Sequence, residues 1–317
     1  MRRHTCSRGD CELVLVRPDA RLRPGVIGYG AYRLAGGEPQ QWYFAPNGSV
    51  SVFLTLDGEM SAGHTGEGEG AATTLSRPSV FYGAHARPKI LRRQGAVEGV
   101  EISVLPWVAR RLFGASMDDL ADTVVDADAV IGRHLPFLAE AVSEASDWPA
   151  RFAVLDHQLL RWTARADSAR SSARDPAPTV LHAWDLITGT AGTMPIHDVA
   201  ARARWSRRQL EIRFREQIGL TPKRLARGLR LDRAIALLST GLSQADTASA
   251  AGFSDQPHLA REFRTLTGMP PGRFLRALSL GCSWPTIPQD PLACFAFVQD
   301  PEGEPSPDFP REGRTAS

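Results

Sequence analysis

Cysteine, lysine and long apolar runs are scarce in this sequence of 317 residues. Its four cysteines fall at Cys6 and Cys11, then at Cys282 and Cys294, which is too few for a disulfide scaffold and outside the CxxC spacing of zinc sites. We therefore expect a reducing, cytoplasmic location. The chain has no run of about 18 apolar residues and no secretion signal, which predicts a soluble protein without a membrane partner.

The positive charge is concentrated in the third quarter of the chain. The formal net charge of +2 divides into −1 for residues 1–175, +7 for residues 176–278 and −4 for residues 279–317. Clustered arginines gain affinity for a polyanion because they displace counterions from its phosphates. Charge alone leaves a nucleic acid, an acidic membrane and an ordinary solvated surface open.

The first half of the chain has the pattern of short strands followed by helices. Residues 50–56 alternate apolar and polar side chains, and residues 100–104 repeat this alternation. Between residues 12 and 104 the pattern predicts an antiparallel sandwich or small barrel. A helix is predicted at 135–145, and another by one apolar stripe: Phe152, Leu155, Leu159 and Trp162. These helices would pack on the barrel or form a dimer seam.

Two segments lack the apolar bulk needed for a core. Residues 167–178 are polar and end in prolines, which is typical of a linker. Residues 279–317 are Pro-rich and acidic, with one short apolar run at 294–298, and predict a loosely ordered tail. We therefore expect a first domain at 1–166, a linker, a second domain at 179–278 and a tail.

The second domain contains an internal repeat with an offset of 49 residues. The recurring positions are Leu210, Phe214, Arg215, Gly219, Pro222 and Arg224, which return as Leu259, Phe263, Arg264, Gly268, Pro271 and Arg273. Each copy predicts a helix, a tight turn and a second helix, capped by Ser206 in the first copy and by Ser254 or Asp255 in the second. This is a helix-turn-helix, whose second helix can enter the major groove of DNA.

The outward faces of the two second helices would decide what they contact. The predicted core anchors are Leu210, Phe214, Leu259 and Phe263, and the predicted outward side chains are Arg208, Glu211, Ile212, Arg215, His258, Arg261 and Arg264. Arginine can bind guanine through two hydrogen bonds, Gln256 suits adenine, and Ile212 suits a thymine methyl. Arg207, Arg215 and Arg264 are assigned to phosphates. A single exposed arginine is explained by a helix face in contact with solvent. Two matching sets of arginines favour contact with the major groove of DNA.

A continuous helix is predicted between the motifs at residues 223–239. Its apolar stripe is Leu231, Ala234, Ile235 and Leu238, despite Gly228. Such a connector would let one chain contact two successive major-groove segments about 34 Å apart.

These residues resemble the AraC family of bacterial transcription regulators. The resemblance is carried by residues 248–264 and 268–274, and it covers about residues 180–276. It implies an all-α domain of seven helices with two helix-turn-helix motifs, and places Val180, Trp184 and Ile187 on the first helix. It assigns base reading to Arg208, Glu211, Ile212, Gln256, His258 and Arg261. It also implies double-stranded DNA and RNA polymerase as partners, without a cofactor.

Two positions depart from the family pattern. Arg204 stands in the first turn where many relatives have glycine, so a left-handed backbone there would cost about 1 kcal/mol. Thr247 replaces a usual aliphatic residue in the short helix of the second motif and would weaken that helix.

The first domain is similar, more distantly, to the cupin-like sensor domains of AraC-type regulators, at residues 99–107 and 118–120. We therefore expect an α+β two-domain fold: a cupin-like antiparallel β-barrel with helices, then the all-α double helix-turn-helix domain. The resemblance implies effector binding or homodimer formation. The aromatic residues that could line an effector cavity are Trp42, Tyr43, Phe44, Phe81 and Tyr82, although aromatic residues on strands are more often core.

Catalysis is not predicted. The sequence has no GxSxG, P-loop or dinucleotide-binding fingerprint. A metal-dependent cupin enzyme would need closely spaced histidines, whereas His64 and His85 are isolated. We expect a sequence-specific transcription regulator. The alternative is a ligand- or protein-binding scaffold whose first domain is the active part and whose DNA-binding domain is vestigial.

Overall fold

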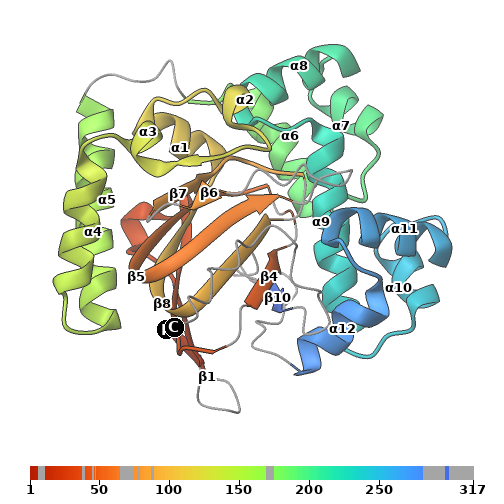
Figure 1. The fold of residues 1–317 in the computed structure, drawn as a ribbon. Helices are drawn as coiled ribbons and strands as arrows, with labels where there is room; N and C mark the ends of the chain where they lie inside the picture. Colours follow the sequence, from red (N-terminus) through yellow and green to blue (C-terminus); the bar gives the residue numbers. More distant parts are fainter. Residues whose placement is uncertain are drawn as a thin grey trace.

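The computed structural model describes residues 1–5, 11–37, 40–44, 46, 48–64, 75–76, 79–86, 89–168, 175–280 and 297–299. Within these residues, an antiparallel sheet with flanking helices is followed by a helical region (Figure 1). This is the expected α+β order. No helix in the described part of the chain is both long and apolar enough to cross a bilayer.

The sheet is open. Its strands are β1 (Arg2–Thr5), β2 (Cys11–Val16), β3 (Val26–Leu34), β4 (Gln40–Phe44), β5 (Val50–His64), β6 (Leu75–Ser76), β7 (Ser79–Tyr82), β8 (Lys89–Val104), β9 (Val124–Asp126) and β10 (Phe297–Gln299). The main path is β1-β2-β3-β8-β5-β7-β9, and β4 pairs with β8 at its side. Among the described strands the ends of this path, β1 and β9, do not pair, so the expected closed barrel is not confirmed. Register shifts in the long strand β5 mark bulges, which bend a sheet without closing it.

The structure differs from two expectations, one about the C-terminal tail and one about the cysteines. The tail contributes β10, which pairs antiparallel with β4 and places Phe297 opposite Phe44. Phe297 and Val298, the last two residues of the apolar run noted at 294–298, lie in this strand, so these residues of the tail belong to the sheet. Cys11 is disulfide-bonded, contrary to the expectation of reduced thiols. The rest of the tail after residue 280, and residues 169–174 of the predicted linker, lie outside the described residues.

The helices of the first half cover one face of the sheet. They are α1 (Pro106–Phe113), α2 (Met117–Leu120), α3 (Ala127–Ile131), α4 (His134–Glu144) and α5 (Trp148–Ser168), with a short 3-10 turn η1 (Ala20–Leu22). The predicted stripe of α5 is buried in the core against the sheet, and Phe152 stacks on Tyr29 with ring centroids 5.9 Å apart. Packing on the sheet, one of the two alternatives, is therefore confirmed.

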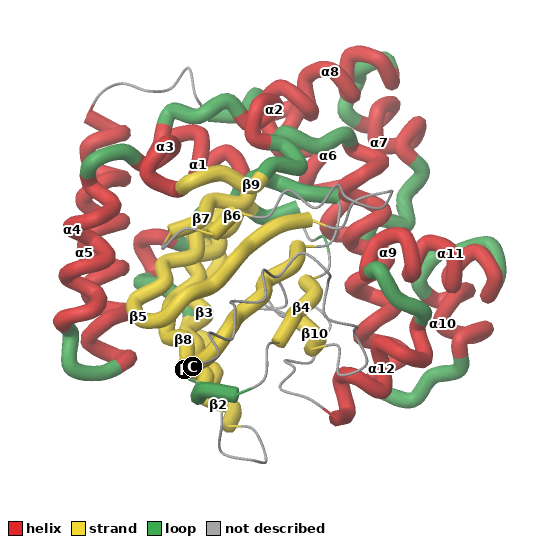
Figure 2. The backbone as a smooth tube through the Cα atoms, in the orientation of Figure 1, coloured by secondary structure: helices red, strands yellow, loops and turns green. Residues whose placement is uncertain are grey.

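The second half consists of α6 (Pro178–Gly189), α7 (Ile196–Arg202), α8 (Arg207–Ile218), α9 (Pro222–Ser239), α10 (Gln244–Ala250), α11 (Gln256–Thr267) and α12 (Pro271–Leu280). The long helix α9 runs between one group, α6 to α8, and a second group, α10 to α12 (Figure 2). Each group has its own apolar core, and α9 contributes to both. The first group lies beside α1 and α2, at the upper right of Figure 1, whereas α4 and α5 lie at the left of that view.

Candidate nucleic-acid interface

The turns of the two motifs have the same hydrogen-bond pattern. In the first motif the Arg204 N–H donates to the carbonyl three residues earlier, and the next N–H donates to the carbonyl five residues before it. Gly252 and the residue after it repeat this pair of bonds. This is a Schellman turn, which needs one residue with left-handed backbone. Arg204 at φ +56° and Gly252 at φ +77° provide it, so the expected left-handed backbone at Arg204 is confirmed.

Helix α8 begins at a reciprocal cap and divides cleanly into two faces. The Ser206 hydroxyl accepts the Gln209 N–H at 3.2 Å, and the Gln209 side-chain oxygen accepts the Ser206 N–H at 3.0 Å. Leu210 and Phe214 are fully buried, as predicted. The opposite face is exposed to solvent, and its predicted contact residues are Arg207, Arg208, Glu211 and Ile212. Ile212 is 46% exposed, one of the few large apolar side chains on the described surface.

Helix α11 repeats this division. Asp255 caps it, accepting the His258 N–H at 2.6 Å. Leu259 and Phe263 are fully buried, and the Phe263 ring meets Phe274 edge-on with centroids 5.2 Å apart. The predicted contact residues on its exposed face are Gln256, Arg261 and Arg264.

His258 lies differently from the other predicted base-reading residues. Its Nδ1 accepts the Ser254 N–H at 3.3 Å, and its ring meets Phe253 edge-on at 5.5 Å between centroids. The side chain is half-buried, so it braces the turn that leads into α11. The helical period predicted that His258 points outward from the helix, but it could not predict the contact of its ring with the preceding turn.

One frame holds both recognition helices. Helix α9 is continuous over 18 residues, which corresponds to about 27 Å. Arg227 of α9 donates to Glu262 of α11 twice, from Nε at 2.7 Å and from Nη2 at 3.1 Å. Such a two-bond pair fixes an angle as well as a distance. Arg230 of α9 also donates to the Gly192 carbonyl at 3.1 Å, just before the first motif.

The first motif packs directly against the N-terminal domain. Arg215 of α8 donates from Nε to Asp118 Oδ1 at 2.6 Å, and this hydrogen bond raises the pKa of the Arg215 guanidinium. Arg224 of α9 pairs with Asp122 at 2.6 Å. Gly228, which appeared as a weakness of α9, permits this approach: a Cβ there would lie 2.6 Å from the Pro46 carbonyl oxygen. Arg215, assigned to a phosphate, is thus paired with a carboxylate in this structure.

Sequence reasoning missed a cationic groove between α8 and α9. The groove encloses about 190 Å³, and its lining is Ile196, Arg207, Glu211, Thr221, Pro222, Lys223, Arg224 and Arg227. Arg207 and Lys223 are exposed and make no ion pair within the part of the chain that the structure describes. The N-terminus of α9 adds partial positive charge at the same place. The Lys-Arg dipeptide after Pro222 was the available sequence signal.

The five aromatic residues assigned to an effector cavity do not share one space. Phe81 belongs to the core that faces the helices, whereas Trp42, Phe44 and Tyr82 belong to the core on the other face of the sheet. All four are buried, and of Tyr43 the structure describes the backbone, paired with Ile90. The cause is strand geometry, because neighbouring residues of one strand point to opposite faces.

Two of these rings instead surround a buried cation. Lys89 is fully buried, and its Nζ lies 5.4–5.6 Å from the ring centroids of Phe44, Phe53 and Tyr82. The same Nζ donates to Ser51 Oγ at 2.8 Å and pairs with Glu101 at 3.4 Å. Burial raises the pKa of the Glu101 carboxyl, while Lys89 opposes this shift.

The histidines belong to no metal cluster in the described residues. His85 is fully buried and its Nδ1 lies 3.3 Å from the Gly83 carbonyl oxygen. The side chain of His64 lies outside the described part. Within that part, no three His, Cys, Asp or Glu side chains come together as metal ligands.

Comparisons with known proteins point to one kind of domain. Residues 199–277 match a family model described as a helix-turn-helix domain. The chain is similar to the HTH-type transcriptional regulator CdhR of Pseudomonas aeruginosa, with 29% identity over 178 residues, covering 56% of this chain and 49% of the relative. It is also similar to the HTH-type transcriptional regulator GbdR of the same species, with 38% identity over 77 residues, covering 24% of this chain and 21% of the relative.

The matched segments therefore span about half of the first relative and about a fifth of the second. Among solved structures, ToxT from Vibrio cholerae gives a TM-score of 0.44 with 14% sequence identity, covering 78% of this chain and 97% of that chain.

Proposed function

We propose that this chain, which carries a helix-turn-helix domain of the AraC type at residues 199–277, is a sequence-specific DNA-binding transcription regulator. The observation that carries the proposal is the pair of recognition helices, α8 and α11, each with a buried apolar face and an exposed polar face. Both helices pack against α9, so the distance between them is set before the protein binds DNA.

The exposed side chains of α8 and α11 are assigned either to base reading or to phosphate binding. Base reading is assigned to six positions: Arg208, Glu211, Ile212, Gln256, His258 and Arg261. Among these, Arg208 and Arg261 suit guanine, and Ile212 suits a thymine methyl. His258 would act mainly by positioning the start of α11, because its ring is held by Ser254 and Phe253.

Phosphate contacts set the position of a domain on DNA without selecting sequence. We assign Arg207, Arg215 and Arg264 to this role, and add Lys223, which lines the same groove as Arg207. Arg215 could take part only after it leaves Asp118.

The N-terminal domain is proposed to bind an effector or to pair subunits. It packs on α8 and α9, so a change in that domain can reach the first motif directly. RNA polymerase and a second copy of the chain are the expected partners besides double-stranded DNA. The cupin-like character of this domain also stays a prediction, because the described strands form an open path.

The test is a mobility-shift titration of the full chain against genomic fragments with excess bulk competitor DNA. A regulator is expected to select some fragments at least about 1,000-fold over competitor at a fixed salt concentration. The competing scaffold function predicts equal, salt-sensitive retention of all fragments. Uniform retention at every salt concentration would contradict the proposal.

A further inference from the structure

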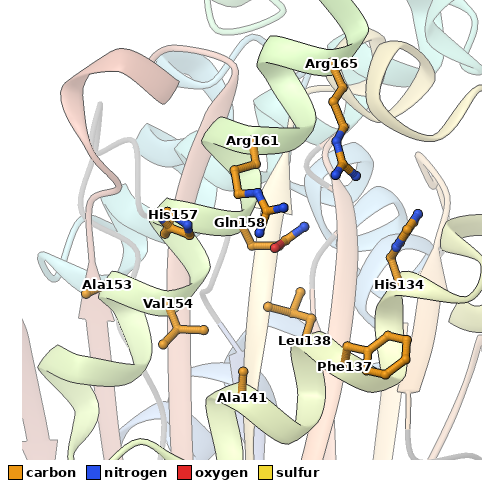
Figure 3. Close-up of a pocket in the computed structure, with 10 residues that line it drawn as sticks. All are labelled: His134, Phe137, Leu138, Ala141, Ala153, Val154, His157, Gln158, Arg161 and Arg165. Atoms are coloured by element: carbon orange, nitrogen blue, oxygen red, sulfur yellow. The ribbon is translucent and has the colours of Figure 1, made fainter.

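A cavity of about 570 Å³ opens between α4 and α5, on the side of these helices that faces away from the sheet (Figure 3). Helix α4 contributes Phe137 and Leu138 to its lining, and α5 contributes Val154, Arg161 and Arg165. The volume lies within the range of small-molecule sites. This cavity is separate from the proposed DNA-contacting helices, because α4 and α5 lie at the left of Figure 1 and α8 and α11 at the right.

The cavity face of α5 is its more exposed face. The opposite stripe of the helix, from Phe152 to Trp162, already packs on the sheet. On the cavity side, Leu138 belongs to the same apolar core and Val154 packs against it, whereas Phe137 of α4 is 68% exposed. A large exposed aromatic ring in a preformed hollow indicates a binding surface.

The charge of the cavity has one sign. Arg161 and Arg165 are four residues apart on one face of α5, and both side chains extend toward the space between the helices (Figure 3). Neither makes an ion pair within the described residues, and the lining contains no acidic residue. Like charges at this spacing repel each other. An anion between the two guanidinium groups would remove this repulsion and add charge-assisted hydrogen bonds.

We propose that this cavity binds a small organic anion with an apolar, aromatic body. The anionic group would lie between Arg161 and Arg165, and the body would pack on Phe137, Leu138 and Val154. A second copy of the chain is the other possible occupant, and sedimentation of the wild type and of Phe137→Ser tests it. The proposal does not depend on DNA binding.

The experiment is isothermal titration calorimetry of the full chain without DNA. The three probes have the same phenylbutyl body and differ in the charge of the end group: phenylbutyrate, phenylbutanol and phenylbutylamine. We expect saturable binding of phenylbutyrate, weaker binding of the neutral alcohol, and no binding of the amine. Arg161→Gln and Arg165→Gln should each weaken phenylbutyrate binding about three- to fivefold, since both side chains are exposed. Phe137→Ser should weaken both the acid and the alcohol.

Arg233→Gln is the matched control, because Arg233 is an exposed cation of α9 that does not line the cavity. Thermal unfolding of every variant verifies that each one folds. Equal affinity for acid and alcohol, or unchanged affinity in both cavity arginine variants, would overturn the proposal. It would also be overturned if the wild type bound no probe while Phe137→Ser converted a dimer to a monomer in sedimentation. That result would make the hollow an interface between copies.

Discussion

The two helix-turn-helix motifs have the same kind of apolar core and the same turn, but they differ in what they contact outside their own helices. The first motif contacts the N-terminal domain through Arg215 and Asp118, and the neighbouring helix α6 contacts it through the edge-on rings of Trp107 and Trp184, 5.0 Å apart. The second motif is joined to α9, through Arg227 and Glu262. Two similar sequence repeats can therefore have different neighbours. One motif is coupled to the N-terminal domain, and the other is coupled to helix α9.

Removing a buried aromatic ring from the core of the second motif should have the largest effect on stability. Phe263→Ala should lower the free energy of unfolding by about 3–5 kcal/mol, because a fully buried ring leaves a cavity beside Phe274. Urea unfolding followed by circular dichroism measures the change. Phe137→Ala, at an exposed ring, is the control and should have little effect. An unchanged midpoint for Phe263→Ala would mean that the buried face of α11 is misassigned.

Arginine truncations separate base reading from phosphate binding. Arg261→Ala should lower affinity for a selected site by about 1–3 kcal/mol and relax preference at one base step. Arg207→Ala should weaken selected and random DNA alike, because a phosphate contact carries no sequence information. Competition binding with both DNAs measures the difference. If both variants lost affinity equally on both DNAs, the assignment of roles would be wrong.

The short helix of the second motif contains a buried polar group that the first motif lacks. Thr247 is fully buried, and its hydroxyl has no hydrogen-bond partner among the residues that the structure describes. Thr247→Val should therefore raise the free energy of unfolding by about 1 kcal/mol, measured by urea denaturation. Ser249→Ala, at an exposed position of the same helix, should change it by less than about 0.5 kcal/mol. A loss of stability in Thr247→Val would point to a bond that the hydroxyl makes.

The turn of the first motif carries backbone strain that Gly252 avoids in the second. Arg204→Gly should relieve about 1 kcal/mol of left-handed strain and lose part of this to unfolded-chain entropy, a net gain of about 0.5 kcal/mol. Gly252→Ala is the opposite case, because its φ is positive and the added Cβ would lie 2.9 Å from Thr193. Thermal unfolding of the pair should show opposite signs, and equal signs would contradict the comparison.

Breaking the link to the N-terminal domain should have the smallest effect. Asp118→Asn weakens the pair with Arg215 and should tighten DNA binding about two- to threefold, because an exposed ion pair contributes little. Asp119→Asn removes a neighbouring exposed charge that makes no ion pair in the described residues, and it controls for net charge. Equal tightening in both variants would show that Arg215 plays no part.

Much of the second domain was accessible from the sequence. The offset repeat located Leu210, Phe214, Leu259 and Phe263, and all four are fully buried. The caps and the end of α8 at Gly219 also follow the prediction, because they depend on residues within one or two turns of each other. The left-handed backbone at Arg204 was instead suggested by the family resemblance, because many relatives have glycine at this position.

The remaining features depend on contacts between distant segments. Neither the pairing of β10 with β4 nor the burial of Lys89 beside Glu101 leaves a local pattern in the sequence. The aromatic residues were found on strands, as expected, but strand alternation distributed them between two cores.

By itself, the amino-acid sequence determined the helical period, the turns and the outward faces of α8 and α11, because side chains three or four residues apart share a helix face whatever surrounds it. Only the tertiary structure decided that Arg215 meets Asp118, that α4 and α5 leave a cationic cavity, and that a tail strand pairs with β4. These contacts join residues many positions apart, and their partners are selected by packing rather than by neighbouring residues.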